Sequence, residues 1–359
     1  MNILKMATSY LYPNQPSYMI LFVTSRCNAK CGFCFYGKEV NCPENKNAEL
    51  TKQEYEKISR KCGNVPYLLV SGGEPVLRDD LFDIIGYFIK NANTQFITVP
   101  SNGLSKGKSL ELFSRLTEMY PECHFRAAFS IDFDNMAHDL SRGVEGCLEK
   151  VAETAREMGK LRSAKSNLTM DVVSVYLNSS LQDHRSMMKW VRETITPDNH
   201  ELHLLRPEWP EVTHPDIETE MFLSEVKRYR KGSSQRENRY LSPFFRGLNN
   251  LYIKGLEKVM DGKYLAACTA GRKFTVISET GKVRLCECRE DVLGDLRTSE
   301  YDLRGILRRS RRYLDYMNHD KCSCTWECAV SCNIVCNPTF LPQLFRETVR
   351  QFFSSRKDA

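Results

Sequence analysis

The amino-acid sequence predicts an α/β fold in which helices cover a parallel sheet. Between Ser17 and about Arg206, strand-like and helix-like stretches alternate along the chain. Short apolar runs such as Tyr67–Val70 are typical of buried strands, whereas Asp80–Asn91 carries its apolar residues at helical spacing. Repeated strand–helix units imply a parallel sheet with helices outside it. Periodicity alone does not distinguish a partial barrel from a flat, doubly wound sheet.

The predicted strands of this region are short and are separated by predicted helices. We expect strands over Ser17–Thr24, Tyr67–Val70, Phe96–Val99, Phe125–Ile131, Asn167–Tyr176 and Glu201–Leu205. Thr51 and Glu54 form a capping box that opens a helix running to about Cys62. Apolar residues at helical spacing predict the other helices over Asp80–Asn91, Leu110–Tyr120, Val144–Met158 and Asp183–Thr194. Sheets of this kind bind ligands at the carboxyl ends of their strands, so the functional site is expected there.

The pattern changes after Arg206. Proline and charge are more frequent in residues 207–261, which we expect to form a connector with helices near Glu218–Arg230 and Pro243–Met260. From Cys268 on, short strands and cysteine loops are expected, followed by a helix over Leu344–Phe353 that packs on its own domain. The predicted domains are a core at 17–206, the connector at 207–261, a cysteine-rich domain at 262–340 and a C-terminal helix and tail at 341–359.

Composition narrows the classes of function. The 359 residues carry a net charge of +6 that is spread along the chain, from which we infer no nucleic-acid partner. No apolar run approaches the ~18 residues that a membrane span needs, and Met1 to Ser17 lacks the apolar core of a secretory signal. We therefore expect a cytoplasmic protein. Its fifteen cysteines then indicate metal or cluster ligation rather than disulfides, apart from four that we interpret as packing residues: Cys42, Cys62, Cys123 and Cys147.

The most informative stretch is Cys27–Cys34, which reads C-x-x-x-C-x-x-C and follows the first predicted strand. Three thiolates on one tight loop can hold three corners of a cubane iron–sulfur cluster, and the fourth iron then stays open for a substrate or cofactor. Fully ligated electron-transfer clusters use four cysteines instead. On this loop alone, a zinc site with a distant fourth ligand and simple burial of small apolar side chains remain alternatives.

A second motif, Ser71-Gly72-Gly73-Glu74-Pro75, follows the second predicted strand. Its glycines let the backbone approach a ligand closely, and a glutamate beside them can fix the orientation of that ligand. With both motifs in this order, the chain resembles the radical S-adenosylmethionine (SAM) enzymes, which carry such a cysteine loop after their first strand and G-G-E-P after their second. The resemblance implies a partial TIM-like (β/α)6 barrel and a SAM-cleaving [4Fe–4S] cluster on Cys27, Cys31 and Cys34.

The resemblance also assigns contacts to SAM. Gly72, Gly73 and Glu74 match the segment that binds the methionine amine in this family. Ser101 and Asn102 match the polar pair that follows the third strand and contacts the ribose or carboxylate region.

Three further residues match contacts of the same family. Ser130, near the end of the fourth predicted strand, belongs to a further contact segment. Arg142 lies in a stretch that resembles the family's H-D-x-x-R-G run and would pair with the methionine carboxylate, with a surface ion pair as the alternative. Phe33 would stack near the adenine, with simple core packing as the alternative.

The C-terminal cysteines resemble the SPASM extension of radical SAM enzymes. Cys268 is followed by twelve residues, Gly281, four residues and Cys286, and the flanking stretches Arg272–Ile277 and Lys282–Leu285 suit a β-hairpin. The later spacing departs from the SPASM pattern, because only the final C-x3-C steps agree. We favour one auxiliary [4Fe–4S] cluster with ligands drawn from Cys268, Cys286, Cys322, Cys324 and Cys328.

Two alternatives stay open for this region. Its eight cysteines suffice for two cubanes, and the roles of Cys288, Cys332 and Cys336 are unassigned. A structural zinc site also takes four thiolates, although the hairpin spacing fits the SPASM pattern.

The resemblance implies that SAM is cleaved reductively and that the resulting 5′-deoxyadenosyl radical removes hydrogen from a substrate. That substrate is a small molecule, such as a sugar, nucleotide or lipid precursor, or else a ribosomally made peptide or protein side chain. The first strand is expected near Ser17, so we expect no leader-peptide-binding domain before the barrel. A reductant such as flavodoxin or ferredoxin is the expected protein partner. A third hypothesis, a cluster-binding protein without catalysis, is disfavoured by the intact motifs. No residue stands out as a catalytic acid, base or hydrogen donor.

Overall fold

A computed structural model of the chain describes residues 15–176, 181–205, 219–231, 242–263, 265–310 and 324–354. Its centre is a nine-stranded sheet with the strand order β6-β5-β4-β3-β2-β1-β7-β8-β9. The first six strands are parallel neighbours in chain order: β1 (Tyr18–Thr24), β2 (Tyr67–Gly72), β3 (Phe96–Ser101), β4 (His124–Ser130), β5 (Leu168–Tyr176) and β6 (Asn199–Leu204). The predicted α/β fold with a parallel sheet is therefore confirmed.

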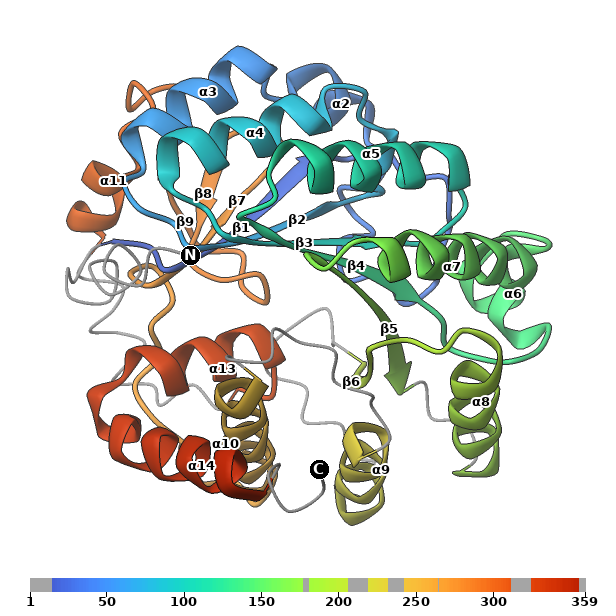
Figure 1. Ribbon diagram of the computed structural model, residues 1–359. Coiled ribbons are helices and arrows are strands. Elements are labelled where there is room, and N and C mark those ends of the chain that lie inside the picture. Colours follow the sequence, from blue (N-terminus) through green and yellow to red (C-terminus); the bar gives the residue numbers. More distant parts are fainter. Residues whose placement is uncertain are drawn as a thin grey trace.

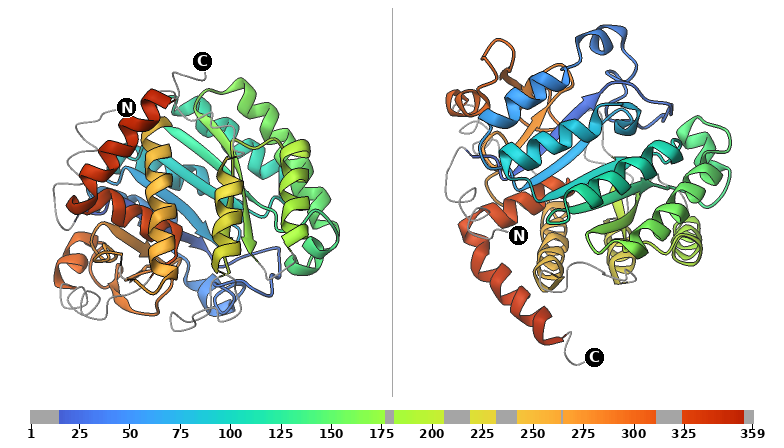
Figure 2. Two further views of the ribbon diagram at one scale, coloured as in Figure 1. Left: turned by 90° about the horizontal axis from the view of Figure 1, so that it is seen from below. Right: turned by 45° about the horizontal axis from the view of Figure 1, so that its top comes forward.

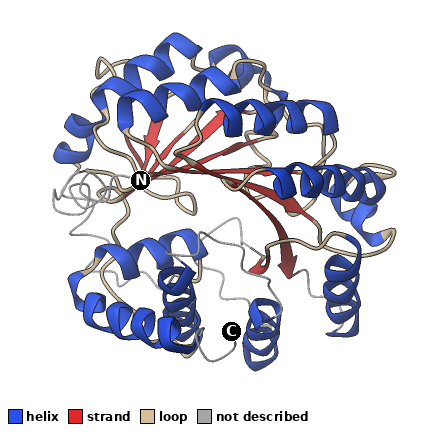
Figure 3. Cartoon of the chain, in the orientation of Figure 1, coloured by secondary structure: helices blue, strands red, loops and turns tan. Residues whose placement is uncertain are grey.

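Helices connect these strands and cover the outer face of the curved sheet (Figure 1). They are α2 (Pro43–Ala48), α3 (Lys52–Lys61), α4 (Leu81–Ala92), α5 (Lys106–Met119), α6 (Ala137–Arg142), α7 (Cys147–Ala164) and α8 (Leu181–Thr194), with a 3-10 turn, η1, at Pro75–Leu77. The predicted capping box opens α3, since the side chains of Thr51 and Glu54 each accept a hydrogen bond from the backbone of the other. Figure 3 shows that the sheet bends away from these helices, so that its other face is concave.

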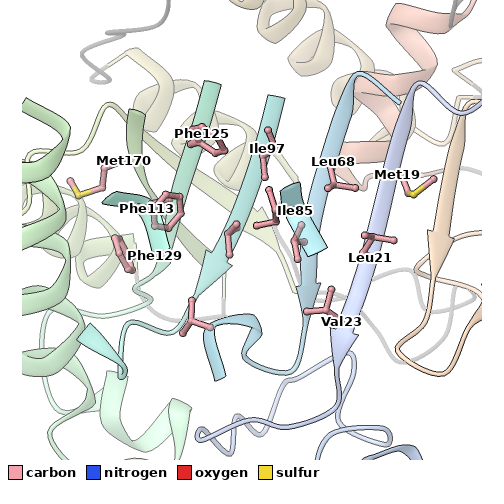
Figure 4. Close-up of a cluster of buried hydrophobic side chains, with 14 of the residues drawn as sticks. Met19, Leu21, Val23, Leu68, Ile85, Ile97, Phe113, Phe125, Phe129 and Met170 are labelled. Atoms are coloured by element: carbon pink, nitrogen blue, oxygen red, sulfur yellow. The ribbon is translucent and has the colours of Figure 1, made fainter. Parts of the chain in front are cut away.

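The core forms where the strands meet these helices. Met19, Leu21 and Val23 of β1 point to the helix side, where they join apolar side chains of the neighbouring strands and of α4 and α5 (Figure 4). The alternate residues Ile20 and Phe22 are also buried, but they belong to a second apolar cluster on the other face of the sheet. A strand that is buried on both faces needs a continuous apolar run, which explains the sequence of β1.

The C-terminal hairpin extends the same sheet. β7 (Phe274–Ile277) and β8 (Lys282–Arg284) pair antiparallel, as predicted, and β8 also pairs with β9 (Val292–Asp295), which α11 (Leu303–Arg309) follows. β7 runs parallel to β1, with Tyr18 opposite Phe274 and Leu21 opposite Ile277. Main-chain hydrogen bonds therefore join the cysteine-rich region to the first strand of the chain, an arrangement that the sequence pattern did not predict.

Helices from the C-terminal half lie beneath the concave face. They are α9 (Thr219–Lys231), which packs against β6, and a group of three formed by α10 (Ser242–Met260), α13 (Glu327–Cys336) and α14 (Leu341–Ser354), as Figures 1 and 2 show. A further 3-10 turn, η2 (Pro338–Phe340), joins α13 to α14. In the part of the chain that the structure describes, no helix is both long enough and apolar enough to cross a membrane.

Several predicted elements differ from the observed ones. α5 begins at Lys106 rather than Leu110, because its first turn is polar and carries no apolar signal. α7 begins at Cys147 rather than Val144, after Gly146 with a φ of 67°. The expectation of cysteine loops near the C-terminus was wrong for α13, whose cysteines recur every fourth residue and so lie on one helix face. Of the four cysteines interpreted as packing residues, three are buried and Cys42 is partly exposed.

Candidate active site

The three cysteines of the front loop, residues 27–34, follow β1 at the carboxyl edge of the sheet. All three are free and partly exposed. The backbone amide of Ala29 donates to the Sγ of Cys27 at 3.4 Å, and the amide of Cys34 donates to the carbonyl of Cys31 at 3.3 Å. Burial raises the pKa of Cys27 to about 11 and also raises the pKa of Cys34. Iron that binds here must therefore displace the thiol protons.

Asn41 closes the front loop. Its Oδ1 accepts a hydrogen bond from the amide of Cys27 and its Nδ2 donates to the carbonyl of Cys27, both at 3.0 Å. The φ of Asn41 is 57°, a left-handed conformation that asparagine tolerates better than most residues. The sequence analysis did not identify Asn41. Its contact with Cys27 spans 14 positions in the chain, and such a contact leaves no local sequence pattern.

The two glycines of the second motif lie against the start of the front loop. A Cβ atom on Gly73 would lie 2.3 Å from the carbonyl oxygen of Arg26, and one on Gly72 would lie 2.4 Å from that of Thr24. Gly72 also has a φ of 124°, which disfavours any side chain. The structure thus gives these glycines a different reason from the one the sequence suggested: they let the end of β2 pass close to the backbone that leads into Cys27.

Glu74 is buried at the same edge. One of its carboxylate oxygens, Oε2, accepts a hydrogen bond from the amide of Asn102 at 2.7 Å. The other oxygen, Oε1, is buried and has no hydrogen-bond partner among the described residues. Burial raises the pKa of Glu74 to about 7, although hydrogen bonds from Asn102 and Ser101 partly offset this effect. A buried oxygen without a partner is costly, so this site fits a cationic hydrogen-bond donor.

The end of β3 connects Glu74 with the front loop. The Nδ2 of Asn102 donates to the Oδ1 of Asn28 at 2.8 Å and lies 3.9 Å from the Sγ of Cys27. Ser101 accepts a hydrogen bond from the amide of Gly103 at 3.0 Å. The structure therefore brings Asn102 next to Cys27, while Ser101 contacts Glu74.

Arg142 forms a buried ion pair. Its Nη2 lies 2.6 Å from the Oδ2 of Asp132, just beyond the end of β4, and its Nη1 lies 3.8 Å from the Sγ of Cys31. Because Arg142 is only 8% exposed, the surface ion pair considered for it is wrong. The carboxylate of Asp132 also accepts from the amide of Val175 at 3.0 Å, which fixes the arginine relative to β5. Asp132 as the partner of Arg142 was missed by the sequence analysis.

Phe33 and Ser130 complete the predicted set. The guanidinium of Arg142 lies over the ring of Phe33, 5.1 Å from its centre, which is within cation–π range. Ser130 is the last residue of β4, is partly buried and pairs with Val173 of β5. Six of the predicted contact residues thus lie at the ends of β2, β3 and β4, the three cysteines follow the end of β1, Phe33 lies on the front loop itself, and Arg142 ends α6.

The C-terminal cysteines that the structure describes gather in the apolar cluster that also holds Cys34 and Tyr36. The charges of Cys288, Cys324 and Cys268 all act on the pKa of Cys286, which a hydrogen bond with Cys288 and burial raise well above its usual value. On α13, the Sγ atoms of Cys332 and Cys336 are 3.7 Å apart, and the hydroxyl of Tyr18 donates to the Sγ of Cys328 at 3.2 Å.

The expected ligand set of the C-terminal region stays a prediction. Cys268, Cys286 and Cys324 are electrostatic neighbours, and Cys288, which had no predicted role, is part of the same group. Cys322 lies outside the described residues. Within those residues, no three His, Cys, Asp or Glu side chains converge as the ligands of a single metal ion.

A cavity of about 280 Å³ lies at the opposite, amino-terminal edge of the sheet. It opens between the first residues of β1 to β6 and the helices α10 and α13, and aromatic side chains from both layers line it, including Tyr67, Phe96 and Phe245. The sequence analysis expected ligands at the carboxyl edge only and did not predict this cavity.

Charged side chains of the cavity form one connected network. Arg126 pairs with both Asp171 and Glu201, so its charge is fully matched. The ring of His203 lies 3.2 Å from Glu201 and 3.6 Å from Glu327 of α13. Carboxylates therefore outnumber the arginine at this edge of the sheet.

Comparison with known proteins identifies the family. Residues 21–191 match the profile of the Radical SAM superfamily. This stretch of the chain is a radical SAM domain. This match runs from within β1 to within α8 and includes every residue of the candidate site at the carboxyl edge. The expected family of enzymes is thus confirmed.

Two relatives of this radical SAM chain are informative. It is 31% identical over 152 residues to the pre-heme d1 synthase of Dinoroseobacter shibae, which covers 42% of this chain and 35% of the relative. It is 24% identical over 178 residues to the GTP 3',8-cyclase of Alkaliphilus oremlandii, which covers 48% of this chain and 52% of the relative. The chain thus matches about half or less of the length of each of these proteins.

Solved structures match nearly the whole radical SAM chain. Native anSMEcpe with bound AdoMet has a TM-score of 0.56 and 16% identity, covering 94% of this chain and 97% of that one. The same protein with bound AdoMet and Kp18Cys peptide has a TM-score of 0.56 and 16% identity, covering 95% and 98%. At this identity the similarity shows the fold, which is the partial barrel that the sequence implied, and the C-terminal cysteine-rich region fits a SPASM extension.

The residues at the carboxyl edge fit the [4Fe–4S] cluster and SAM that the family implies. Three free cysteines on one loop supply three iron ligands. The buried Oε1 of Glu74 supplies the acceptor that an ammonium group needs.

Proposed function

We propose that this chain cleaves SAM reductively and uses the product to remove hydrogen from a substrate bound in the barrel. The observation that carries the proposal is the meeting of the three cysteines, the unpartnered Oε1 of Glu74 and the Arg142–Asp132 pair at one edge of the sheet. When bound, the cluster and SAM supply a 5′-deoxyadenosyl radical as the hydrogen-abstracting agent. An electron donor such as flavodoxin or ferredoxin is part of this proposal.

The residues of the chain bind and orient the cofactor. Cys27, Cys31 and Cys34 hold the cluster, and Glu74 accepts a hydrogen bond from the methionine amine. Ser101, Asn102 and Ser130 line the rest of the SAM site.

Arg142 acts as a fixed cation at the same edge. Its Nε and Nη2 are engaged by Asp132, and its Nη1, which also contacts the Sγ of Cys31 at 3.8 Å, would meet the methionine carboxylate. The ring of Phe33 packs against this guanidinium and would lie near the adenine of bound SAM.

We infer one auxiliary [4Fe–4S] cluster in the C-terminal region, with Cys268, Cys286, Cys288 and Cys324 as the favoured ligands. This set is supported by the packing of the four side chains in one apolar cluster, where Cys288, Cys324 and Cys268 all raise the pKa of Cys286. A second cubane that uses the cysteines of α13 and Cys322 is the alternative.

The division of the chain into domains at residues 206 and 261 is also a proposal.

For the substrate, we propose a small molecule that binds near the cysteines at the carboxyl edge, where the radical forms. The relatives named for GTP and for a heme act on small molecules by their names. The cavity of about 280 Å³ lies at the opposite, amino-terminal edge and is not proposed as the substrate site.

A peptide substrate is the second candidate. It is supported by the solved structures with bound peptide, which share the fold of this chain over 95% of its length.

The central test is the formation of 5′-deoxyadenosine. Protein reconstituted with iron and sulfide under anaerobic conditions and reduced with dithionite should convert SAM to 5′-deoxyadenosine and methionine. A Cys31→Ala variant should lose this activity. The matched control is Cys42→Ala, since the Sγ of Cys42 is partly exposed and donates to Glu44 outside the candidate ligand set. Equal activity in the two variants would remove the basis of the proposal.

A further inference from the structure

The outer face of α14 exposes a stripe of large apolar side chains. Successive residues of an α-helix are rotated by about 100°, so Leu341, Phe345 and Phe352 fall on one narrow stripe. Their exposed fractions are 51%, 72% and 44%, and Phe353 beside them is 59% exposed. Three phenylalanines exposed within one helix go beyond the scattered apolar side chains that are normal for a protein surface.

The opposite face of α14 holds the helix on the fold. Leu344 and Glu347 are buried against α10, and Glu347 pairs with Lys254 of α10 at 2.7 Å. The two helices approach so closely that a Cβ on Gly247 would lie 2.9 Å from the amide of Thr348. The exposed phenylalanines are therefore not needed to dock α14, which lies at the rim of the molecule in both views of Figure 2.

Positive charge borders the exposed aromatic surface on the side of Phe353. Arg346 and Arg350 are exposed and lie about 20–60° beyond Phe353 by helical rotation, roughly 100–180° from the stripe itself. The helix has one acidic residue, Glu347, which is buried and neutralised by Lys254. The exposed surface of α14 is thus aromatic along one side and cationic along its border.

We propose that α14 docks on the surface of an anionic lipid bilayer. The helix lies in the plane of the interface, with the phenylalanine rings at the boundary of the acyl chains and the two arginines at the lipid phosphates. Docking of this kind needs an amphipathic helix and not a spanning one. A second copy of the chain is a poorer occupant, because a symmetric contact through the same stripe would bring the arginine borders of both copies together.

The test uses the full-length protein and lipid vesicles. Sedimentation with vesicles of phosphatidylcholine alone is compared with vesicles that also contain phosphatidylglycerol. Binding is expected for the anionic vesicles only. The double variant Phe345→Ser/Phe352→Ser should bind at least about tenfold more weakly, since each ring loses its apolar burial. The variant Arg346→Gln/Arg350→Gln should bind about 25-fold more weakly, since each arginine contributes roughly fivefold.

The control is Met119→Ser/Met136→Ser, which removes exposed apolar side chains from α5 and from the turn before α6. These methionines are 62% and 78% exposed, so the control should bind like the unchanged protein. Iron content and melting temperature should stay the same in all variants, because every altered side chain is exposed. Equal binding to both kinds of vesicle, or unchanged binding of the phenylalanine variant, would overturn the proposal. A dimer that forms with increasing protein concentration, without vesicle binding, and that the phenylalanine variant abolishes would also overturn the proposal. A second copy of the chain would then cover the apolar stripe.

Discussion

The hydroxyl of Tyr36 donates a hydrogen bond to the carboxylate of Glu279, so the front cysteine loop is fastened to the turn between β7 and β8. Both side chains are buried. The amide of Tyr36 also hydrogen-bonds to Cys34, and this bond lowers the pKa of that thiol against the effect of burial. A second contact runs in parallel, between Arg284 of β8 and Glu39 at 2.8 Å. The C-terminal hairpin is therefore in direct contact with the segment that follows the three front cysteines.

The first prediction concerns this pair. Tyr36→Phe leaves the buried carboxylate of Glu279 without its donor and should lower the free energy of unfolding by about 1–3 kcal/mol. Chemical denaturation of Tyr36→Phe, Glu279→Gln and the double variant should give a coupling energy of about 0.5–3 kcal/mol. The control is Tyr55→Phe, a buried tyrosine whose hydroxyl makes only a long contact of 3.5 Å to the carbonyl of Phe22. Strictly additive effects of the two changes would mean that the contact does not link loop and hairpin.

The second prediction separates two glycines. Gly73→Ala should impair assembly of the front cluster, because the new Cβ would press on the carbonyl of Arg26 and displace the backbone before Cys27. Gly32→Ala lies within the cysteine loop, yet its Cβ would meet nothing within 4 Å. Iron content after reconstitution, measured in a background that lacks the C-terminal cysteines, should fall for Gly73→Ala and stay unchanged for Gly32→Ala. Full iron loading of Gly73→Ala would contradict this prediction, because it would show that the backbone before Cys27 can move to accommodate the new Cβ.

The third prediction is a pH dependence of SAM binding. The pKa of Glu74 is raised to about 7, so the carboxylate is charged above this pH and becomes neutral as the pH falls below it. A neutral carboxyl no longer attracts the ammonium group of SAM, so the affinity should weaken below about pH 7, by up to about tenfold per pH unit. Equilibrium dialysis under anaerobic conditions measures this. Glu74→Gln should bind weakly and without this profile, and the same pH profile in that variant would assign the titration to another group.

The fourth prediction concerns the C-terminal cysteines. A Cys27/Cys31/Cys34 triple-alanine variant should still bind about four irons and four sulfides, as one cubane requires, and should keep the broad thiolate-to-iron absorption. Adding Cys288→Ala should lower this content if Cys288 is a ligand, whereas adding Cys42→Ala should not. Recovery of zinc without sulfide from the triple variant would instead establish a structural zinc module.

The sequence predicted most of the fold, because the six core strands and the helices between them carry strong apolar periodicity. It also placed the candidate site, since Cys27–Cys34 and Gly72–Glu74 are contiguous and follow strands directly. It missed Asn41 and Asp132 because their contacts join residues that are apart in the chain and have no fixed spacing. It missed α13 because cysteine, alanine and serine give little hydrophobic contrast between the two faces of a helix.

The role of Gly73 shows a different limit. A glycine after a strand indicates close approach of the backbone to something, but the sequence does not say to what. The structure shows that the neighbour is the carbonyl of Arg26, which lies in the same chain. Likewise, the sequence does not tell whether Arg142 forms its ion pair at the surface or in the interior. That depends on how α6 packs against the front loop, and no local sequence pattern encodes this packing.

The parallel pairing of β7 with β1 has a consequence for how the protein is made. β1 leaves the ribosome before the other described strands, yet Phe274, which pairs with Tyr18, follows it by 256 residues. Until that point is synthesised, one edge of β1 has unpaired amides and carbonyls and is open to wrong partners. Contacts of such long range form slowly, so we expect the nascent barrel to depend on chaperones for longer than its six parallel strands alone would suggest.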